Sequence, residues 1–408
     1  MNALPESTLA KVAVTGVGCV TALGSEVGET WTKLCNGESA RAPLTAIAVE
    51  GCRVTDGAQA ELPSLPWMHS GSLRYASRAA RLALPAAKQA LAQAGLLGSD
   101  GKCSLRRLEM SVSTTACGME KGEEFLRELW ARRRNGQTAR VSHYQSQQQI
   151  SALHEAFGFD GPSMVVANAC AGGANAIGHG FDLIGAGLAN IVLAGGYDAL
   201  SELVFAGFDG LQALAPDACR PFDRGRRGLM LGEGAAFLVL EDESRATARG
   251  AGILGYIAGY GHSTDTHHLT QPASDGAPLE RAMRQALERS GIDPARVGYV
   301  NAHGTGTPFN DGAEAAAFHR VFGSFSTRLS STKAALGHTL GAAGAIEAVL
   351  CLMSLQTGQL PPQINLLDPE PLVASALVKM GERSNLEATM SINLGFGGSN
   401  AALLFHKP

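Results

Sequence analysis

Short apolar segments typical of β-strands alternate along this chain with longer segments typical of helices. The strand-like segments are rich in β-branched residues and often end in glycine, and they span residues 11–18, 163–167, 190–196, 235–241, 252–260 and 297–301. Helical segments rich in alanine, leucine or glycine span residues 75–95, 171–185, 278–290, 311–321 and 341–357, and a hairpin over 389–393 and 401–405 closes the chain. This alternation predicts an α/β fold with largely parallel, buried sheets.

The length and charge of the chain narrow its class further. Its 408 residues correspond to two or three ordinary domains, which can bury a large core without a disulfide or metal. A net charge of -4 argues against a strongly basic nucleic-acid binder, and 45% hydrophobic residues argue against a disordered polymer. The 50 glycines follow no collagen-like period, so they indicate many tight turns and close backbone approaches.

The cysteines and the apolar segments indicate a cytoplasmic protein. Eight cysteines are scattered without a CxxC pair, which favours reduced thiols over a disulfide scaffold. The first residues lack the basic start and apolar stretch of a signal peptide. The longest apolar candidate, residues 341–355, contains Glu347 and is shorter than a membrane span, so no membrane association is expected.

A cysteine stands between a predicted strand and a predicted helix. Residues 167–175 read Ala-Asn-Ala-Cys-Ala-Gly-Gly-Ala-Asn, with Cys170 at the start of the helix. The positive end of a helix dipole can lower a thiol pKa and favour the nucleophilic thiolate. Most free cysteines are small buried hydrophobes, so from this segment alone both interpretations stay open.

Three further segments place polar residues in glycine-bounded loops. Residues 300–308 deliver His303, residues 331–344 contain Lys333 and His338, and residues 393–400 form a glycine loop, Asn-Leu-Gly-Phe-Gly-Gly-Ser-Asn. A lone histidine is more often structural, but two histidines and a lysine in such loops indicate a reactive site. Neutral imidazoles and backbone N–H groups can stabilise a developing oxyanion or enolate.

Taken together, these segments resemble those of the β-ketoacyl-[acyl-carrier-protein] synthases of type I/II, the Cys-His-His condensing enzymes of the thiolase superfamily. The resemblance runs from the opening strand to the last glycine loop, and the order and spacing of the motifs are specific. It implies a thiolase-like α/β fold, with duplicated halves in an α-β-α-β-α layered arrangement. The first half would cover residues 1–255 and carry the nucleophile, and the second would cover residues 256–408 and carry both histidines.

The resemblance also implies a reaction. Cys170 would accept an acyl chain from the phosphopantetheine of an acyl carrier protein, and decarboxylation of malonyl-carrier would supply the carbanion that elongates it. His303 and His338 would assist decarboxylation and stabilise the enolate. Lys333 would orient this charge network, with Glu314 as an acidic residue near it. The product would serve fatty acid biosynthesis or a specialised polyketide or polyene pathway.

Other positions match the family's substrate contacts. The backbone N–H groups of Cys170 and Phe396 would form the oxyanion hole, and Phe396 would also gate the acyl pocket. Thr305 and Thr307 match hydroxyls that hold the pantetheine amides, and Thr270 is a third candidate. The resemblance implies neither a metal nor a diffusible cofactor, because the substrates travel on the carrier.

Several positions depart from the family's pattern. Leu336 stands where a threonine is usual, Gly306 replaces a common serine, and Leu394 replaces a phenylalanine. Phe309 and Asn310 replace small residues, and residues 113–119 are not the usual glycine-rich loop that helps to set acyl length. These departures favour a specialised synthase over a housekeeping one.

The expected partners are an acyl carrier protein and a second subunit. The region that matches the carrier-docking helix has few basic residues, and the candidates to meet an acidic carrier are Arg74, Arg78, Arg81, Arg224, Arg226 and Arg227. Each could equally be a solvated surface arginine, as residues 132–134 are expected to be. The dimer would be a homodimer or a heterodimer with a chain-length factor.

Alternative interpretations are weaker. A non-elongating chain-length factor typically lacks the nucleophile that Cys170 supplies, a thiolase should carry a second cysteine near the last glycine loop, and His338 disfavours the starter-type synthase. The segment from Thr15 to Thr21 lacks the third glycine of a dinucleotide loop. The spacing of His262, Asp265, His267 and His268 fits no common zinc site, and no Gly-x-Ser-x-Gly elbow indicates a serine hydrolase.

Overall fold

The computed structural model describes residues 11–68, 76–131, 138–323 and 326–408. The strands are β1 (Val12–Thr21), β2 (Ala42–Pro43), β3 (Asp56–Gly57), β4 (Glu109–Ser113), β5 (Ser163–Val166), β6 (Ile191–Asp198), β7 (Gly234–Asp242), β8 (Gly255–Thr264), β9 (Val297–Asn301), β10 (Arg328–Ser330), β11 (Ala388–Gly395) and β12 (Ser399–His406). The helices are α1 (Val27–Cys35), α3 (Arg78–Gln93), α4 (Met119–Trp130), α5 (Thr138–Tyr144), α6 (Ser146–Phe157), α7 (Gly172–Gly185), α8 (Glu202–Gly210), α9 (Glu243–Ala248), α10 (Ala277–Ser290), α11 (Pro308–Phe322), α12 (Lys333–Leu336) and α13 (Ala343–Thr357). Short 3₁₀ turns are η1 (Ala169–Ala171), η2 (Pro294–Arg296) and η3 (Leu340–Ala342).

The main sheet repeats one strand order twice. Its first group runs β5-β4-β6-β7-β1 and its second runs β10-β9-β11-β12-β8, so each strand has a counterpart at the same place in the other group. A short antiparallel pairing of β1 with β8 joins the two groups. This repetition is the structural form of the expected duplication.

The expectation of largely parallel sheets is wrong. The pairs of β4 with β5 and β6, and of β9 with β10 and β11, are parallel. The pairs that involve β1, β7, β8 and β12 are antiparallel. The sequence pattern could not separate the two arrangements, because a strand buried on both faces is a continuous apolar run in either of them.

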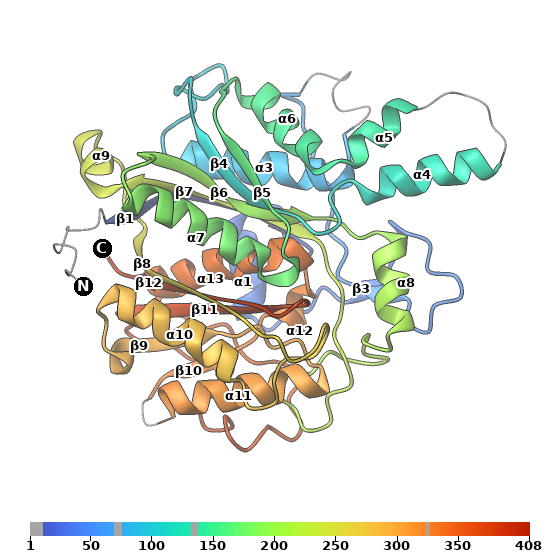
Figure 1. The fold of residues 1–408 in the computed structure, drawn as a ribbon, viewed down its shortest axis with the longest axis vertical. Coiled ribbons are helices and arrows are strands. Elements are labelled where there is room, and N and C mark those ends of the chain that lie inside the picture. Colours follow the sequence, from blue (N-terminus) through green and yellow to red (C-terminus); the bar gives the residue numbers. More distant parts are fainter. Residues whose placement is uncertain (1–10, 69–75, 132–137, 324–325) are drawn as a thin grey trace.

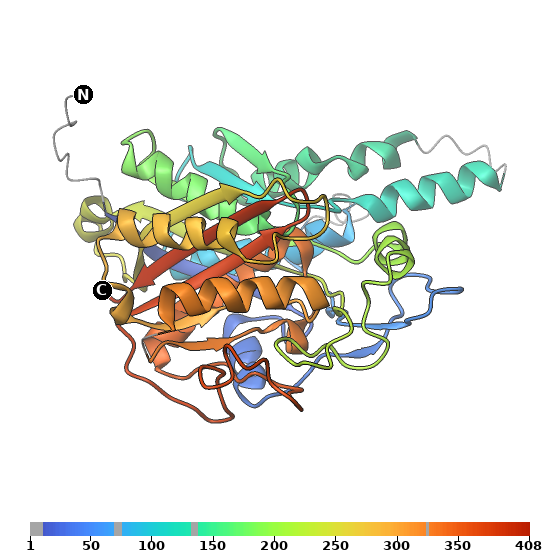
Figure 2. The same ribbon diagram turned by 60° about the horizontal axis from the view of Figure 1, so that its bottom comes forward.

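Helices and strand groups form five layers, as Figures 1 and 2 show. Helices α7 and α13 pack against each other between the two strand groups. Helix α3 covers the outer face of the first group with α6 against it, and α10 covers the outer face of the second with α11 against it. The layers explain why α13 is apolar on all sides, since a helix between two sheets has no solvent face.

The central helices approach closely because their contact faces carry small residues. A Cβ atom placed on Gly173 of α7 would lie only 2.8 Å from the backbone nitrogen of Ala345 in α13. One stretch of the described residues, Leu340–Thr357, is long and apolar enough to cross a membrane, but 83% of it is buried in the protein. It is therefore the core helix of the central layer, although its apolar run is longer than the sequence suggested.

The ends of the strands position the candidate site. The segments with Cys170, His303, Lys333 and His338 follow β5, β9 and β10, and the 395–398 loop follows β11. All of these are carboxyl ends of parallel strands, where open α/β sheets usually bind ligands. Helices α4 and α5 extend away from the layers on the same side of the molecule as α8 (Figures 1 and 2).

Candidate active site

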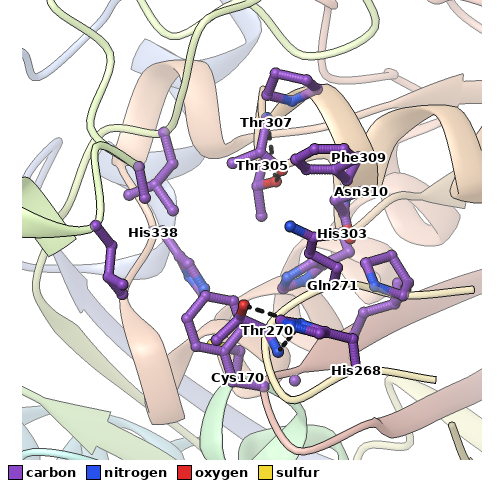
Figure 3. A pocket seen from close by; sticks show the side chains of 18 of the residues that line it. Cys170, His268, Thr270, Gln271, His303, Thr305, Thr307, Phe309, Asn310 and His338 are labelled. Atoms are coloured by element: carbon purple, nitrogen blue, oxygen red, sulfur yellow. Dashed lines mark hydrogen bonds between the residues drawn. The ribbon is translucent and has the colours of Figure 1, made fainter. Parts of the chain in front are cut away.

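A pocket of about 390 Å³ brings together residues from both strand groups. Of the residues that the sequence singled out, the following line it: Cys170, Arg227, Asp265, His268, Thr270, His303, Thr305, Thr307, Phe309, Asn310, His338, Leu394 and Phe396. Figure 3 shows His303 and His338 on different sides of the space above Cys170. Lys333 and Glu314 do not line the pocket; they are buried behind it.

Cys170 lies in the turn η1, between β5 and α7, as the sequence suggested. Its side chain is 6% exposed, and burial raises the pKa of the thiol to about 11. The charge of Lys333 and the backbone N–H groups of Phe396 and Cys170 act in the opposite direction but do not outweigh burial. The lowering of a thiol pKa that a helix start can cause is therefore outweighed here by burial, because the start of this helix is inside the protein.

Two backbone N–H groups point at the thiol. They belong to Cys170 itself and to Phe396, the pair named from the sequence as an oxyanion hole. Gly395 allows this approach, because a Cβ atom there would lie 3.3 Å from the Cys170 nitrogen and 3.1 Å from the Asn168 carbonyl oxygen. The Phe396 ring stacks on Phe208 of α8, with ring centroids 5.8 Å apart.

The two histidine rings lie edge to face. Their centroids are 5.2 Å apart and their planes make an angle of 87°. Burial, with the charge of Lys333 as the next cause, holds the pKa of both His303 and His338 well below the usual value. Both imidazoles are therefore neutral near pH 7, and each carries one N–H to donate.

Lys333 forms a buried ion pair with Glu347 of α13. The other carboxylate oxygen of Glu347 accepts a hydrogen bond of 2.6 Å from the Asn393 side chain. Burial raises the pKa of Glu347 despite these two partners. In the sequence, Glu347 is visible only as a charge within an apolar helix. Because a buried charge needs a partner, its place in that helix was the signal that an ion pair forms there.

Glu314 of α11 holds the loop after β9 in place by hydrogen bonds. Its carboxylate accepts hydrogen bonds from the backbone N–H groups of His303 and Gly304 and from the Asn310 side chain. Burial and the nearby Asp311 raise the pKa of Glu314 to about 8. Glu314 is thus near Lys333, as expected, but its hydrogen bonds go to the backbone of the histidine loop.

The candidate pantetheine contacts line the pocket in two places. Thr305 and Thr307 come from the loop after β9, with their hydroxyls 2.9 Å apart. Thr270 comes from the loop after β8 and bonds through its backbone N–H to the His268 ring at 3.2 Å. Figure 3 shows all three among the residues around the pocket, with Thr270 near His268.

The departures from the family pattern have structural counterparts. Gly306 has a φ of 78°, and a Cβ atom there would lie 2.8 Å from the Gly228 carbonyl oxygen, so this backbone requires glycine. Leu336 belongs to the central core, and Leu394 lines the pocket.

The unusual loop at residues 113–119 is held by Asp198 at the end of β6. The carboxylate accepts hydrogen bonds from the Thr114 hydroxyl and from the backbone N–H groups of Thr115, Ala116 and Gly341. Burial raises its pKa to about 6. Asp198 thereby ties this loop to the turn that follows His338.

The arginines proposed for carrier docking divide into two groups. Arg78 pairs with the buried Glu233, and Arg226 pairs with Glu370 and donates to three backbone carbonyls, so both turn inward. Arg81 is half-buried, whereas Arg224 and Arg227 are exposed and paired with aspartates. Arg74 and residues 132–134 lie outside the described residues.

The cluster around Asp265 is used for loop structure. Its carboxylate accepts hydrogen bonds from the backbone N–H groups of His267 and Ala273. Within the part of the chain that the structure describes, no group of three His, Cys, Asp or Glu residues is placed to hold a metal ion.

Comparisons with known proteins agree with this geometry. Residues 9–246 match the N-terminal domain of the β-ketoacyl synthases, and residues 254–367 match their C-terminal domain. Nodulation protein E of Rhizobium meliloti (strain 1021) is 37% identical over 405 residues, which cover 97% of this chain and 98% of the relative. The 3-oxoacyl-[acyl-carrier-protein] synthase 2 of Staphylococcus aureus (strain N315) is 34% identical over 413 residues, with 97% and 98% covered.

A solved structure gives the same result in three dimensions. The ishigamide ketosynthase/chain length factor superposes with a TM-score of 0.90 at 32% identity, covering 98% of this chain and 99% of the other. Because the two domain matches and these relatives extend along nearly the whole chain, the protein belongs to the β-ketoacyl synthase family.

Proposed function

We propose that this β-ketoacyl synthase elongates an acyl chain by decarboxylative Claisen condensation with malonyl-carrier, with Cys170 as its nucleophile. One observation carries the assignment: a single pocket contains Cys170, His303 and His338, and two backbone N–H groups point at the thiol. A buried thiol, two neutral imidazoles and an oxyanion hole are the groups that acyl transfer followed by enolate formation requires.

In the first step the Cys170 sulfur attacks the carbonyl carbon of an acyl-carrier thioester. A carbon–sulfur bond to Cys170 forms, the bond to the pantetheine sulfur breaks, and the proton of the Cys170 thiol ends on the departing pantetheine thiol. The N–H groups of Cys170 and Phe396 stabilise the oxyanion between these events. Because burial raises the thiol pKa, the proton leaves together with the attack instead of before it.

In the second step malonyl-carrier loses carbon dioxide and leaves an enolate on its thioester. The neutral rings of His303 and His338 each donate one N–H hydrogen bond to the enolate oxygen. A ring that turned its unprotonated nitrogen toward this oxygen could not do so. The enolate carbon then attacks the acyl carbon on Cys170, and the sulfur leaves as a thiolate that takes up a proton from solvent to restore the thiol. The product is a β-ketoacyl chain, longer by the two carbons of the extender, on the carrier.

The charged residues behind the pocket position this machinery. Lys333 lowers the pKa of both imidazoles and of the Cys170 thiol through its charge. Glu347 and Asn393 fix the lysine, and Glu314 holds the loop that delivers His303. We assign to Thr305, Thr307 and Thr270 the contacts with the pantetheine arm, because all three line the route to the thiol.

A second subunit is proposed at the edge strand β5. The edge strand β10 is covered, because Leu329 hydrogen-bonds to Ala376 and Val378. Strand β5 pairs only with β4 among the described residues, and Met164 on it is 48% exposed. The unpaired backbone N–H and C=O groups of such an edge strand can pair with a strand of another subunit. The subunit is a second copy or a chain-length factor, and the likeness to a ketosynthase/chain length factor supports the second choice.

We also propose a cytoplasmic location and a division of the chain into two halves. All eight cysteines are free, including the half-buried Cys35 and Cys103, which fits a reducing cytoplasm.

The proposed division at residues 255 and 256 lies at the start of β8, the first strand of the second group. The pathway is fatty acid or polyketide biosynthesis.

The test is a condensation assay with acyl-carrier and malonyl-carrier substrates. We expect a β-ketoacyl-carrier longer than the starting chain by the two carbons of the extender, measured by the mass of the carrier. The Cys170→Ala variant should lose elongation while still releasing carbon dioxide from malonyl-carrier. His303→Asn and His338→Asn should spare acyl loading more than condensation. Elongation by the Cys170→Ala variant would overturn the assignment.

A further inference from the structure

The two N–H groups that point at the Cys170 thiol come from two separate segments of the chain. The Cys170 N–H belongs to the turn between β5 and α7, and the Phe396 N–H belongs to the turn between β11 and β12. Strand β5 is part of the first strand group, and β11 and β12 are part of the second. An oxyanion hole stabilises charge only when its donors keep a fixed place around the reacting carbon. The two turns must therefore be held in a fixed position relative to each other.

Hydrogen bonds among three side chains join these two turns. The side-chain N–H groups of Asn168 and Asn175 each donate a hydrogen bond of 3.1 Å to the Ser399 hydroxyl oxygen. Asn168 is two positions before Cys170, and Ser399 is three positions after Phe396. We call Asn168, Asn175 and Ser399 the Ser399 bridge. It connects the two segments within a few residues of each N–H donor.

The Ser399 bridge is anchored in the core of the protein. The side-chain carbonyl oxygen of Asn175 accepts a hydrogen bond of 2.8 Å from the Tyr260 hydroxyl. Asn175 lies in α7 and Tyr260 in β8, and both side chains are buried, which strengthens a hydrogen bond between them. The position of Ser399 is therefore fixed by an element that follows the first turn and by a strand of the second group.

The turn that carries Cys170 needs support, because its backbone is strained. Ala169, between Asn168 and Cys170, has a φ of 57°, in the left-handed region that residues with a Cβ atom rarely adopt. Such a conformation persists only where the surrounding structure holds it. The hydrogen bond from Asn168 to Ser399 holds the residue directly before the strained position.

We propose that Asn168 and Ser399 are positioning residues, which hold the Phe396 N–H at the place beside Cys170 where the oxyanion of acyl transfer forms. Neither Asn168 nor Ser399 lines the pocket, so both act through the backbone of the turns and not by contact with the substrate. This role rests on the proposed function and adds two residues to it. It also makes the bridge specific to the steps that form an oxyanion on the acyl carbon.

The test measures acylation and decarboxylation separately. In Asn168→Ala and Ser399→Ala we expect the rate constant for acylation of Cys170 at saturating acyl-carrier to fall on the order of tenfold, because a displaced N–H stabilises the oxyanion less. The KM for the acyl-carrier should stay within about twofold of the wild-type value. The double variant should lose little more than Ser399→Ala, because both changes break the same hydrogen bond.

Decarboxylation provides the readout that a general loss of structure would also change. We measure carbon dioxide release from malonyl-carrier in the Cys170→Ala protein, with and without Ser399→Ala. The two rates should be equal, because His303 and His338 stabilise the enolate of this step and the Phe396 N–H does not.

Two further variants control for the loss of a hydroxyl. Ser399→Thr keeps the hydroxyl and should acylate within about twofold of the wild-type rate. Ser290→Ala removes a hydroxyl that also has two partners, the Leu287 carbonyl and the Ile292 N–H, at the end of α10 and outside the pocket lining. It should leave the acylation rate unchanged. If Ser399→Ala does not fold, Asn168→Ala removes the same hydrogen bond from the other turn and decides the question.

The outcomes separate the bridge from the reaction that it serves. Wild-type acylation rates in Asn168→Ala and Ser399→Ala would overturn the inference and leave the synthase intact. Equal losses of acylation and of carbon dioxide release, or a raised KM with an unchanged rate constant, would also overturn it. Failure of the wild-type enzyme to acylate Cys170 with any carrier substrate would overturn the proposed function itself.

Discussion

The ion pair of Lys333 with Glu347 places a positive charge behind the pocket, although neither residue lines it. Both side chains are buried, and the positive charge of Lys333 favours the neutral form of His303 and His338. A buried pair of this kind contributes little net stability, but removing one partner leaves an uncompensated charge. We propose that this charge helps burial to keep His303 and His338 neutral.

Removing either partner of this pair should be costly. We expect Lys333→Met and Glu347→Gln each to lower the free energy of unfolding by about 3–5 kcal/mol, and the double variant to lose much less than the sum. Urea unfolding of the wild type, both single variants and the double variant measures the coupling. Additive losses would contradict a buried, mutually dependent pair.

The buried histidines should make the protein less stable in mild acid. Their pKa values are held below 6.5 in the folded protein, so below pH 6.5 the unfolded chain binds protons that the folded chain does not. Stability is then lost as the pH falls, by about 1.4 kcal/mol per pH unit for each histidine. When the free energy of unfolding is plotted against pH, it should fall less steeply between pH 7 and about pH 5 for His338→Asn than for the wild type. Parallel curves would contradict a neutral, buried His338.

At the scale of elements, an arginine of helix α3 that the sequence offered for carrier docking forms an ion pair inside the protein instead. Ser77 caps the helix by accepting a hydrogen bond from the Ala80 N–H, so the helix begins at Arg78, after the start expected from the sequence. The Arg78 guanidinium binds Glu233, whose carboxylate also accepts from the backbone N–H groups of Ala60 and Leu200. This network fixes the helix to β7 and to the loop after β6.

The Arg78→Gln variant distinguishes a structural arginine from a docking arginine. We expect a loss of stability of about 3–5 kcal/mol, because the buried Glu233 loses its partner. The KM for the acyl-carrier substrate should remain at the wild-type value. Thermal unfolding and steady-state kinetics measure the two effects, with the exposed Arg224→Gln as a control. A raised KM without a loss of stability would show that Arg78 meets the carrier.

The sequence predicted the elements of the site better than its electrostatics. The resemblance to the β-ketoacyl synthases is confirmed. The structure also brings Cys170, His303 and His338 together in one pocket, and their roles there stay a proposal. The raised pKa of Cys170 and the inward turn of Arg78 could not be foreseen, because both depend on burial by residues distant in the sequence. The partner of Glu347 was missed for another reason: Lys333 lies fourteen positions earlier, in the short helix α12, and only the fold shows that the two side chains meet.

At the scale of the whole molecule, the unequal edges of the sheet indicate assembly. The structure covers β10 with its own chain and leaves β5 without a second neighbour among the described residues. Parallel edges with free N–H and C=O groups are usually protected in monomers. The unpaired edge of β5, together with helices α4 and α5, which extend away from the layers (Figure 1), agrees with a subunit that forms a dimer.

A charge on the open edge should weaken that assembly. We expect the wild-type protein to sediment as a dimer, alone or with a chain-length factor, and Met164→Lys to shift it toward the monomer, because charged edges disfavour strand pairing. Met380→Lys places the same charge on another exposed methionine and should have no effect. Sedimentation velocity measures both variants. A Met164→Lys protein that stays fully dimeric would place the interface elsewhere.

The central claim is that Cys170 carries the growing chain. Intact-protein mass spectrometry tests it after the protein is mixed with a panel of acyl-carrier thioesters and then with malonyl-carrier. We predict a mass gain of one acyl group, located on the peptide that contains Cys170, which disappears when malonyl-carrier is added as the elongated product forms. An acyl group found on another residue, or a mass gain that the Cys170→Ala variant retains, would contradict the account.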